Sequence, residues 1–196
     1  MRKVILMLGG LSLTGCRAFD PSLLAPAGAP LAQRLPRLTA EVQPPQFCFR
    51  FDSSAVARDL DTLFARQVRE AVAAPRGAPQ GFAVLTARCV RYGQGGGYSY
   101  VSGLTLGALT VFGFPWSRYH CTVDVQVDVR NRRRELVGTY YAQGKAVLPG
   151  GLYRRTNYQQ KDCDRTLYLQ CVRQGLEQIM PQLQAEGAQL QQGLLP

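Results

Sequence analysis

The sequence RYHCTVDVQVDVR at residues 118–130 decides the fold, because apolar and polar residues alternate along its whole length. A period of two is typical of a β-strand that buries one face and exposes the other. We expect the odd-numbered residues from Tyr119 to Val129 to face the core and the even-numbered residues to face outward. Residues 131–134 have the composition of a turn, and residues 135–148 form the return strand, so the pattern predicts a long antiparallel hairpin.

Segments on both sides of this hairpin extend the sheet and supply helices. Residues 46–51 and 82–92 have the composition of strands, and residues 55–74 carry apolar side chains at helical spacing, with Asp59 on the outer face. A second amphipathic helix is predicted from about residue 162, with Pro181 expected to end or kink it. This order predicts an α+β fold, a mainly antiparallel sheet with two amphipathic helices packed on one face.

An uncharged segment runs from residue 92 to residue 117 and allows three interpretations. It has the length of a membrane-spanning helix, but repeated glycines and a proline argue against one. It is otherwise a buried excursion of the core, or an apolar loop that touches a membrane or a partner. For the last of these, the candidate contact residues are Leu104, Leu106, Leu109, Val111, Phe112, Phe114 and Trp116.

The amino terminus has the composition of a secretory signal peptide. Two positive charges, Arg2 and Lys3, precede a short apolar run that ends in small residues before Cys16. The run is shorter than the roughly 20 residues that a spanning helix needs. The segment that follows, residues 17–45, holds six prolines and cannot form a regular helix, which predicts a semi-extended tether.

The motif Leu13-Thr14-Gly15-Cys16 resembles the lipobox of bacterial lipoproteins. The resemblance implies a diacylglycerol on the Cys16 thiol, cleavage after Gly15, and acylation (palmitate, for example) of the new amino terminus. Arg17, where an Asp would retain the protein in the inner membrane, implies an outer-membrane location facing the periplasm. In topology, the rest resembles the domains of curli-secretion and peptidoglycan-synthase-activator lipoproteins, which implies an assembly or accessory role.

These observations divide the chain into four parts. Residues 1–15 are the predicted signal peptide, and residues 16–45 are the lipidated cysteine with its Pro-rich tether. Residues 46–185 are the predicted α+β periplasmic domain, and residues 186–196 are expected to form a flexible tail. At 196 residues, the chain is long enough for one domain with a substantial core.

The cysteines and the single histidine give little sign of catalysis. If Cys16 carries lipid, an odd number of thiols remains, so at least one is free or pairs with another chain; the five are Cys48, Cys89, Cys121, Cys163 and Cys171. His120 stands alone on an outward strand position, and no catalytic or metal-binding motif is present. We therefore expect a non-enzymatic protein without cofactor, metal or catalytic residue. The alternatives are a secreted periplasmic enzyme that uses a free cysteine and an oligomeric secretion accessory.

The formal charge of +10 points to anionic neighbours. Arg132, Arg133 and Arg134 in the predicted turn form a weak candidate for anionic contact. For an exported protein these neighbours are envelope components rather than nucleic acid. The expected partners are the membrane, through the lipid anchor, and another envelope protein, with oligomerisation left open.

Overall fold

The computed structural model describes residues 20–48, 53–95, 117–150 and 157–194. Within them, four strands form one sheet in the order β1 (Leu38–Val42), β2 (Gly81–Gly95), β3 (Ser117–Asn131) and β4 (Leu136–Gly150). β1 is parallel to β2, and the β2–β3 and β3–β4 pairs are antiparallel. The α+β prediction with a mainly antiparallel sheet is confirmed.

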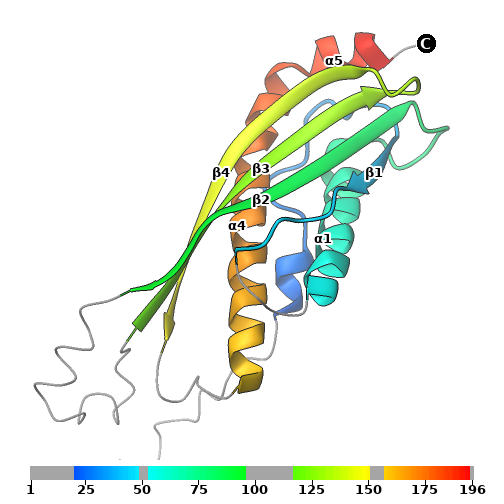
Figure 1. Ribbon diagram of the computed structural model, residues 1–196. Helices are drawn as coiled ribbons and strands as arrows, with labels where there is room; N and C mark the ends of the chain where they lie inside the picture. Colours follow the sequence, from blue (N-terminus) through cyan, green and yellow to red (C-terminus); the bar gives the residue numbers. More distant parts are fainter. Residues whose placement is uncertain (1–19, 49–52, 96–116, 151–156, 195–196) are drawn as a thin grey trace, which may run out of the picture.

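Helices cover one face of this sheet. Figure 1 shows α1 (Ser53–Gln67) and α4 (Asn157–Ala185) on the same side of the curved sheet, with α5 (Gly187–Leu194) at the end where the chain stops. α1 continues into a π-helical turn, Val68–Val72, which closes with a 2.7 Å hydrogen bond from Ala73 N to the oxygen of Val68. The expected helix over residues 55–74 is thus confirmed in position, with a wider final turn.

The alternation along β3 is confirmed. Cys121, Val123, Val125, Val127 and Val129 are buried against the helices, and Tyr119 is half-buried. Burying a valine side chain stabilises the fold by about 1.5–3 kcal/mol, so this strand is a main source of core stability. Its neighbours across the sheet, Leu85 in β2 and Tyr140 in β4, are buried on the same face opposite Val127.

The prediction of a tether is wrong for residues 20–45. Side chains spaced four residues apart are buried in the core, namely Leu23, Ala27, Leu31 and Leu35. Between the short 3-10 helix η2 (Pro21–Leu24) and β1, the backbone bonds to the π-helical turn: the N–H of Leu31 donates to Ala71 O and that of Leu35 to Val72 O. Prolines prevent a helix but not burial, because a segment whose polar groups are satisfied by neighbours can still pack.

The buried amide of Gln67 holds this amino-terminal segment on α1. Its Oε1 accepts from the N–H of Ala27, and its Nε2 donates to the carbonyl oxygen of the same residue at 3.0 Å. The same Nε2 lies 3.2 Å from Met180 Sδ on α4. One side chain therefore joins the amino-terminal segment to both long helices.

The first strand also differs from the prediction. Leu38–Val42 forms β1, whereas in the expected strand 46–51 Gln46 makes only an isolated bridge to Arg88, and residues 49–51 lie outside the described ranges. Alternating phenylalanines predicted this strand, but Phe47 instead packs on the ring of Tyr168, with centroids 5.1 Å apart.

The carboxyl-terminal predictions need two corrections. Pro181 does not end α4, which continues to Ala185; the proline is exposed, so water can hydrate the carbonyl group that it leaves without a donor. Residues 187–194 are a helix rather than a flexible tail, since Leu190 and Leu194 are buried.

Candidate functional site: the open face of the sheet

The face of the sheet opposite the helices carries exposed apolar side chains. Val90 in β2 is 53% exposed, and Tyr141 and Val147 in β4 are 65% and 58% exposed. Val147 lies opposite His120, and Tyr141 lies opposite Gln126, so both belong to rows of side chains that point away from α1 and α4. We call this surface the open face; it extends over β2, β3 and β4.

Near the β3–β4 turn, the polar side chains of the open face form hydrogen bonds with one another. Asp128 is only 6% exposed, and its Oδ1 accepts from Gln126 Nε2 at 2.8 Å and from Thr139 Oγ1 at 3.0 Å. Its Oδ2 accepts from Arg130 Nη2 at 3.2 Å. A buried carboxylate with three donors is stabilised in place, so this cluster has a structural role.

The arginine triplet of the turn does not form one patch. Arg132 Nε donates to the oxygen of Pro79 at 2.9 Å, whereas Arg134 Nη2 pairs with Glu41 at 3.1 Å. The guanidinium of Arg134 also lies 4.6 Å from the ring centroid of Phe82, a cation–π contact. Arg133 is exposed between them.

The opposite end of the open face is basic. A bulge between Cys89 and Arg91 leaves both Val90 and Arg91 exposed in β2. Arg91 and Lys145 lie on either side of Thr122, and three cations make no ion pair with any residue that the structure describes, namely Arg88, Arg91 and Lys145. With Arg118, Val90 and Val147, these three cations form what we call the basic end.

Sequence reasoning missed the basic end, because no local signal in the sequence brings its residues together. Its cations stand at residues 88, 91, 118 and 145, too far apart in sequence to resemble a motif. Once β3 is paired in register, however, the even-numbered positions of β3 and their partners share one face, which brings these cations together. Pairing register was the information that the sequence lacked.

Helix α4 shields the outer edge of the sheet. The backbone N–H of Lys145 donates to Gln174 Oε1 at 2.6 Å, and glutamines one and two turns later donate to β4 carbonyl groups. Those bonds join Gln178 Nε2 to Gln143 O and Gln182 Nε2 to Tyr141 O. Such capping leaves the middle of β4 unavailable for pairing with another strand, so a partner is directed to the face.

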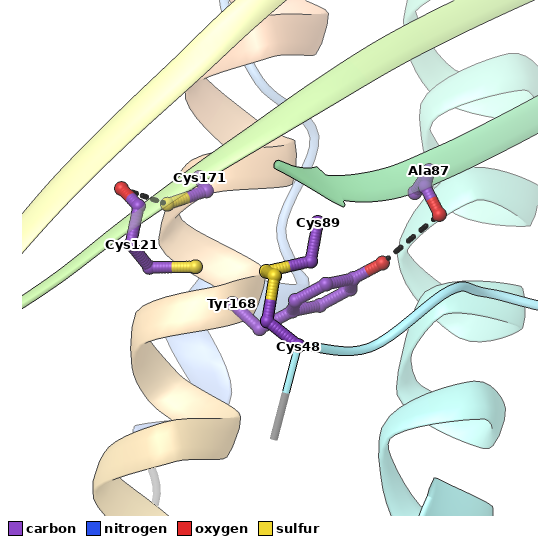
Figure 2. Close-up of a disulfide and its surroundings, with 6 residues drawn as sticks. All are labelled: Cys48, Ala87, Cys89, Cys121, Tyr168 and Cys171. Atoms are coloured by element: carbon purple, nitrogen blue, oxygen red, sulfur yellow. Dashed lines mark hydrogen bonds between the residues drawn. A yellow bond between two sulfur atoms is a disulfide. The ribbon is translucent and has the colours of Figure 1, made fainter. Parts of the chain in front are cut away.

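Two thiols in the core lie near a disulfide whose cysteines are exposed (Cys48) and half-buried (Cys89) (Figure 2). Cys48 and Cys89 form a disulfide, and the free thiols of Cys121 and Cys171 are buried on β3 and α4. The hydrogen bond to Cys121 and burial raise the pKa of Cys171, whereas the pKa of Cys121 is lowered by that same hydrogen bond. Buried thiols do not reach a substrate, which counts against a thiol enzyme using either residue.

Three further features bear on possible sites, namely His120, the residue types that bind metals, and an apolar cavity in the core. His120 lies across Gly93, whose added Cβ would be 2.6 Å from Nε2. Within the described ranges, no cluster of His, Cys, Asp and Glu could hold a metal ion. The apolar cavity between the sheet and the helices, bordered by Phe64 and Leu176, has about 10 Å³, roughly room for one water.

Three predicted features lie outside the described residues. They are Cys16 with its signal peptide, the Cys163 side chain, and the uncharged segment over residues 96–116 with all its candidate contact residues. In the ranges that are described, no helix combines the length and apolarity needed to cross a membrane.

Asp164 of α4 is a buried carboxyl group on the helix-covered side of the sheet, next to Tyr92 of β2. It accepts a 2.6 Å hydrogen bond from the hydroxyl of Tyr92, but burial outweighs this bond and raises the pKa of Asp164 above its ordinary value of 3.8. Burial and the same carboxylate raise the pKa of Tyr92. Folding therefore favours the protonated form of Asp164, because burial penalises the charge more than the bond from Tyr92 stabilises it.

Asp164→Asn is expected to raise the melting temperature at neutral pH. Because folding raises the pKa of Asp164, the protonated carboxyl group contributes its full stability at pH values below the unfolded-state pKa near 3.8. This stability is lost as the pH rises through the folded-state pKa. The difference between variant and wild type should thus be largest at pH 7 and vanish below pH 3.8 in thermal unfolding. Asp61→Asn, at an exposed position of α1, is the control; an equal gain there, or a pH-independent difference for Asp164→Asn, would contradict the assignment.

Comparison with known proteins gives only weak structural likenesses. No family model matches the chain, and no curated protein matches it. A solved structure described as a "putative lipoprotein" from Caulobacter crescentus CB15 aligns with a TM-score of 0.31 and 10% identity. The alignment covers 79% of this chain and 89% of that one.

Proposed function

We propose that this chain is a lipid-anchored, non-enzymatic protein of the outer membrane that faces the periplasm and binds an acidic envelope protein. The observation that carries the proposal is the basic end of the open face, where Arg88, Arg91 and Lys145 stand beside the exposed Val90 and Val147. The lipobox at Leu13–Cys16 supports the anchor and the location.

The chemistry of the basic end suits a protein surface. Exposed cations beside exposed valines match a partner that presents carboxylates beside apolar side chains, with the charges increasing the rate and specificity of association. Three strands of one sheet hold these side chains in a fixed spacing, so little conformational entropy is lost on binding. Capping of the β4 edge by α4 leaves the face as the docking surface.

Photo-crosslinking in cells is the test of this proposal. A benzophenone amino acid at Val147 is expected to give a discrete adduct with another protein in the outer-membrane fraction. Charge reversal by Arg91→Glu with Lys145→Glu should reduce the adduct at least tenfold, because two attractive contacts become repulsive. Cys16→Ser should abolish labelling by a fatty-acid probe and release the chain from the membrane.

The matched control places the same probe at Glu177, an exposed position of α4 on the helical side. Identical adducts from Val147 and Glu177, or an adduct that charge reversal leaves unchanged, would refute the open face as the binding surface. A wild-type chain that takes no fatty-acid label and fractionates as a free protein would refute the anchor.

A further inference from the structure

The two free thiols, Cys121 and Cys171, lie in contact with each other in the core. The thiol of Cys171 donates to the carbonyl oxygen of Cys121 at 3.3 Å, so the side chain from α4 reaches the backbone of β3 at this residue (Figure 2). Both residues are buried, at 1% and 0% exposure. Their positions join the central strand β3 to the middle of helix α4.

The backbones at this point are also close. A Cβ added at Gly144 would meet the carbonyl oxygen of Cys171 at 1.8 Å, so α4 touches β4 without any side chain between them. Ala146, two residues along β4, is the neighbour of Cys121 across the sheet. A helix that packs on a sheet through long side chains holds its cysteine too far away for a disulfide, which needs Cα atoms within about 7 Å.

We propose that Cys121 and Cys171 form a second disulfide, which cross-links α4 to β3 in the exported protein. The proposal rests on the periplasmic location given above, because that compartment favours disulfides. It also accounts for the six cysteines: Cys16 carries lipid, Cys48 pairs with Cys89, Cys121 pairs with Cys171, and Cys163 is left as the single thiol.

The chemistry requires a dithiol–disulfide exchange with an oxidant protein of the envelope. A thiolate of the pair attacks the oxidant's disulfide and forms a mixed disulfide, releasing one oxidant thiolate. The second thiolate of the pair then attacks the sulfur of the first, which closes the Cys121–Cys171 bond and expels the other oxidant thiolate. Two protons and two electrons leave the pair, and the oxidant departs as a dithiol. Since both thiols are buried in the folded chain, the exchange takes place before α4 has packed against the sheet.

Peptide mapping of the full-length chain purified from the cell envelope tests the proposal. The protein is unfolded without reductant in the presence of N-ethylmaleimide and then digested. We expect one peptide pair linked through Cys48 and Cys89, a second linked through Cys121 and Cys171, and maleimide on Cys163. Cys163→Ala should lose the maleimide and keep both linked pairs, whereas Cys171→Ala should transfer a maleimide to Cys121.

The remaining outcomes separate this inference from the proposed function. Maleimide on both Cys121 and Cys171, with Cys48–Cys89 intact, would overturn the second disulfide while leaving the export of the protein supported. Pairing of either residue with Cys163 would overturn it equally. Maleimide on all four described cysteines would overturn the oxidising location itself, and the second disulfide with it.

A stability measurement gives a second, independent readout. In a Cys48→Ala, Cys89→Ala background, a reductant is expected to lower the melting temperature, because it opens the remaining cross-link. Adding Cys121→Ala to that background should abolish this response to the reductant. A response that persists without Cys121, or that is absent in the background variant itself, would contradict the proposal.

Discussion

Gly144→Ala is expected to destabilise the fold by about 3 kcal/mol or more, because the added methyl group collides with backbone rather than with a side chain. Its Cβ would lie 1.8 Å from the oxygen of Cys171 and 2.6 Å from the carbonyl carbon of the same residue. A side chain can change rotamer to relieve such a contact, but a helix backbone in the core must move as a unit. For a domain of this size, the melting temperature should fall by roughly 6–12 °C.

Gly187→Ala is the matched control for this substitution. A Cβ at Gly187, the first residue of α5, meets no atom within 4 Å, so its effect on the core should be negligible. Alanine is the better helix former, and the control should change the free energy of unfolding by at most about 1 kcal/mol in its favour. If Gly144→Ala unfolds at the same temperature as this control, the backbone of α4 does not pack directly on β4.

Arg165→Met is expected to cost about 3 kcal/mol of stability, because it leaves the carboxylate of Asp59 without a counter-ion in the core. Arg165 on α4 holds Asp59 on α1 through both carboxylate oxygens, with Nη2 2.9 Å from Oδ1 and Nε bonded to Oδ2. The side chain of Asp59 is only 11% exposed and that of Arg165 is 25% exposed, so water replaces little of the lost interaction. Urea denaturation of both proteins measures the difference.

Two further variants identify the cause. Combining Asp59→Leu with Arg165→Met removes both charges and should restore stability to within about 1 kcal/mol of the wild type, since an apolar pair avoids the cost of burying ions. Arg66→Met tests an exposed ion pair of α1, with Glu70, and should leave the urea midpoint nearly unchanged. An equal loss in the single and double variants would mean that shape, not charge, holds the two helices together.

The candidate site combines a part that local patterns reveal with a part that they do not. The exposed positions of β3 follow from alternation, so the outward direction of His120, Thr122 and Asp124 was predictable. The basic end was not, because Arg91 and Lys145 come together only when the three strands are in register and the bulge at Val90 shifts that register by one residue. Alternation within a strand carries no information about its neighbour's register.

By itself, the sequence determined the hairpin of β3 and β4, the positions of the two long helices and the α+β class. These depend on periods of two and of about 3.6 residues, which local backbone geometry imposes on any chain that must bury one face. The tertiary structure decided the rest: residues 20–45 joined the core, Asp59 was buried with Arg165, and Cys121 came to lie against Cys171. Each of these depends on partners that are distant in sequence. Contacts between distant residues produce no periodic pattern in the sequence around either residue, so local patterns do not predict them.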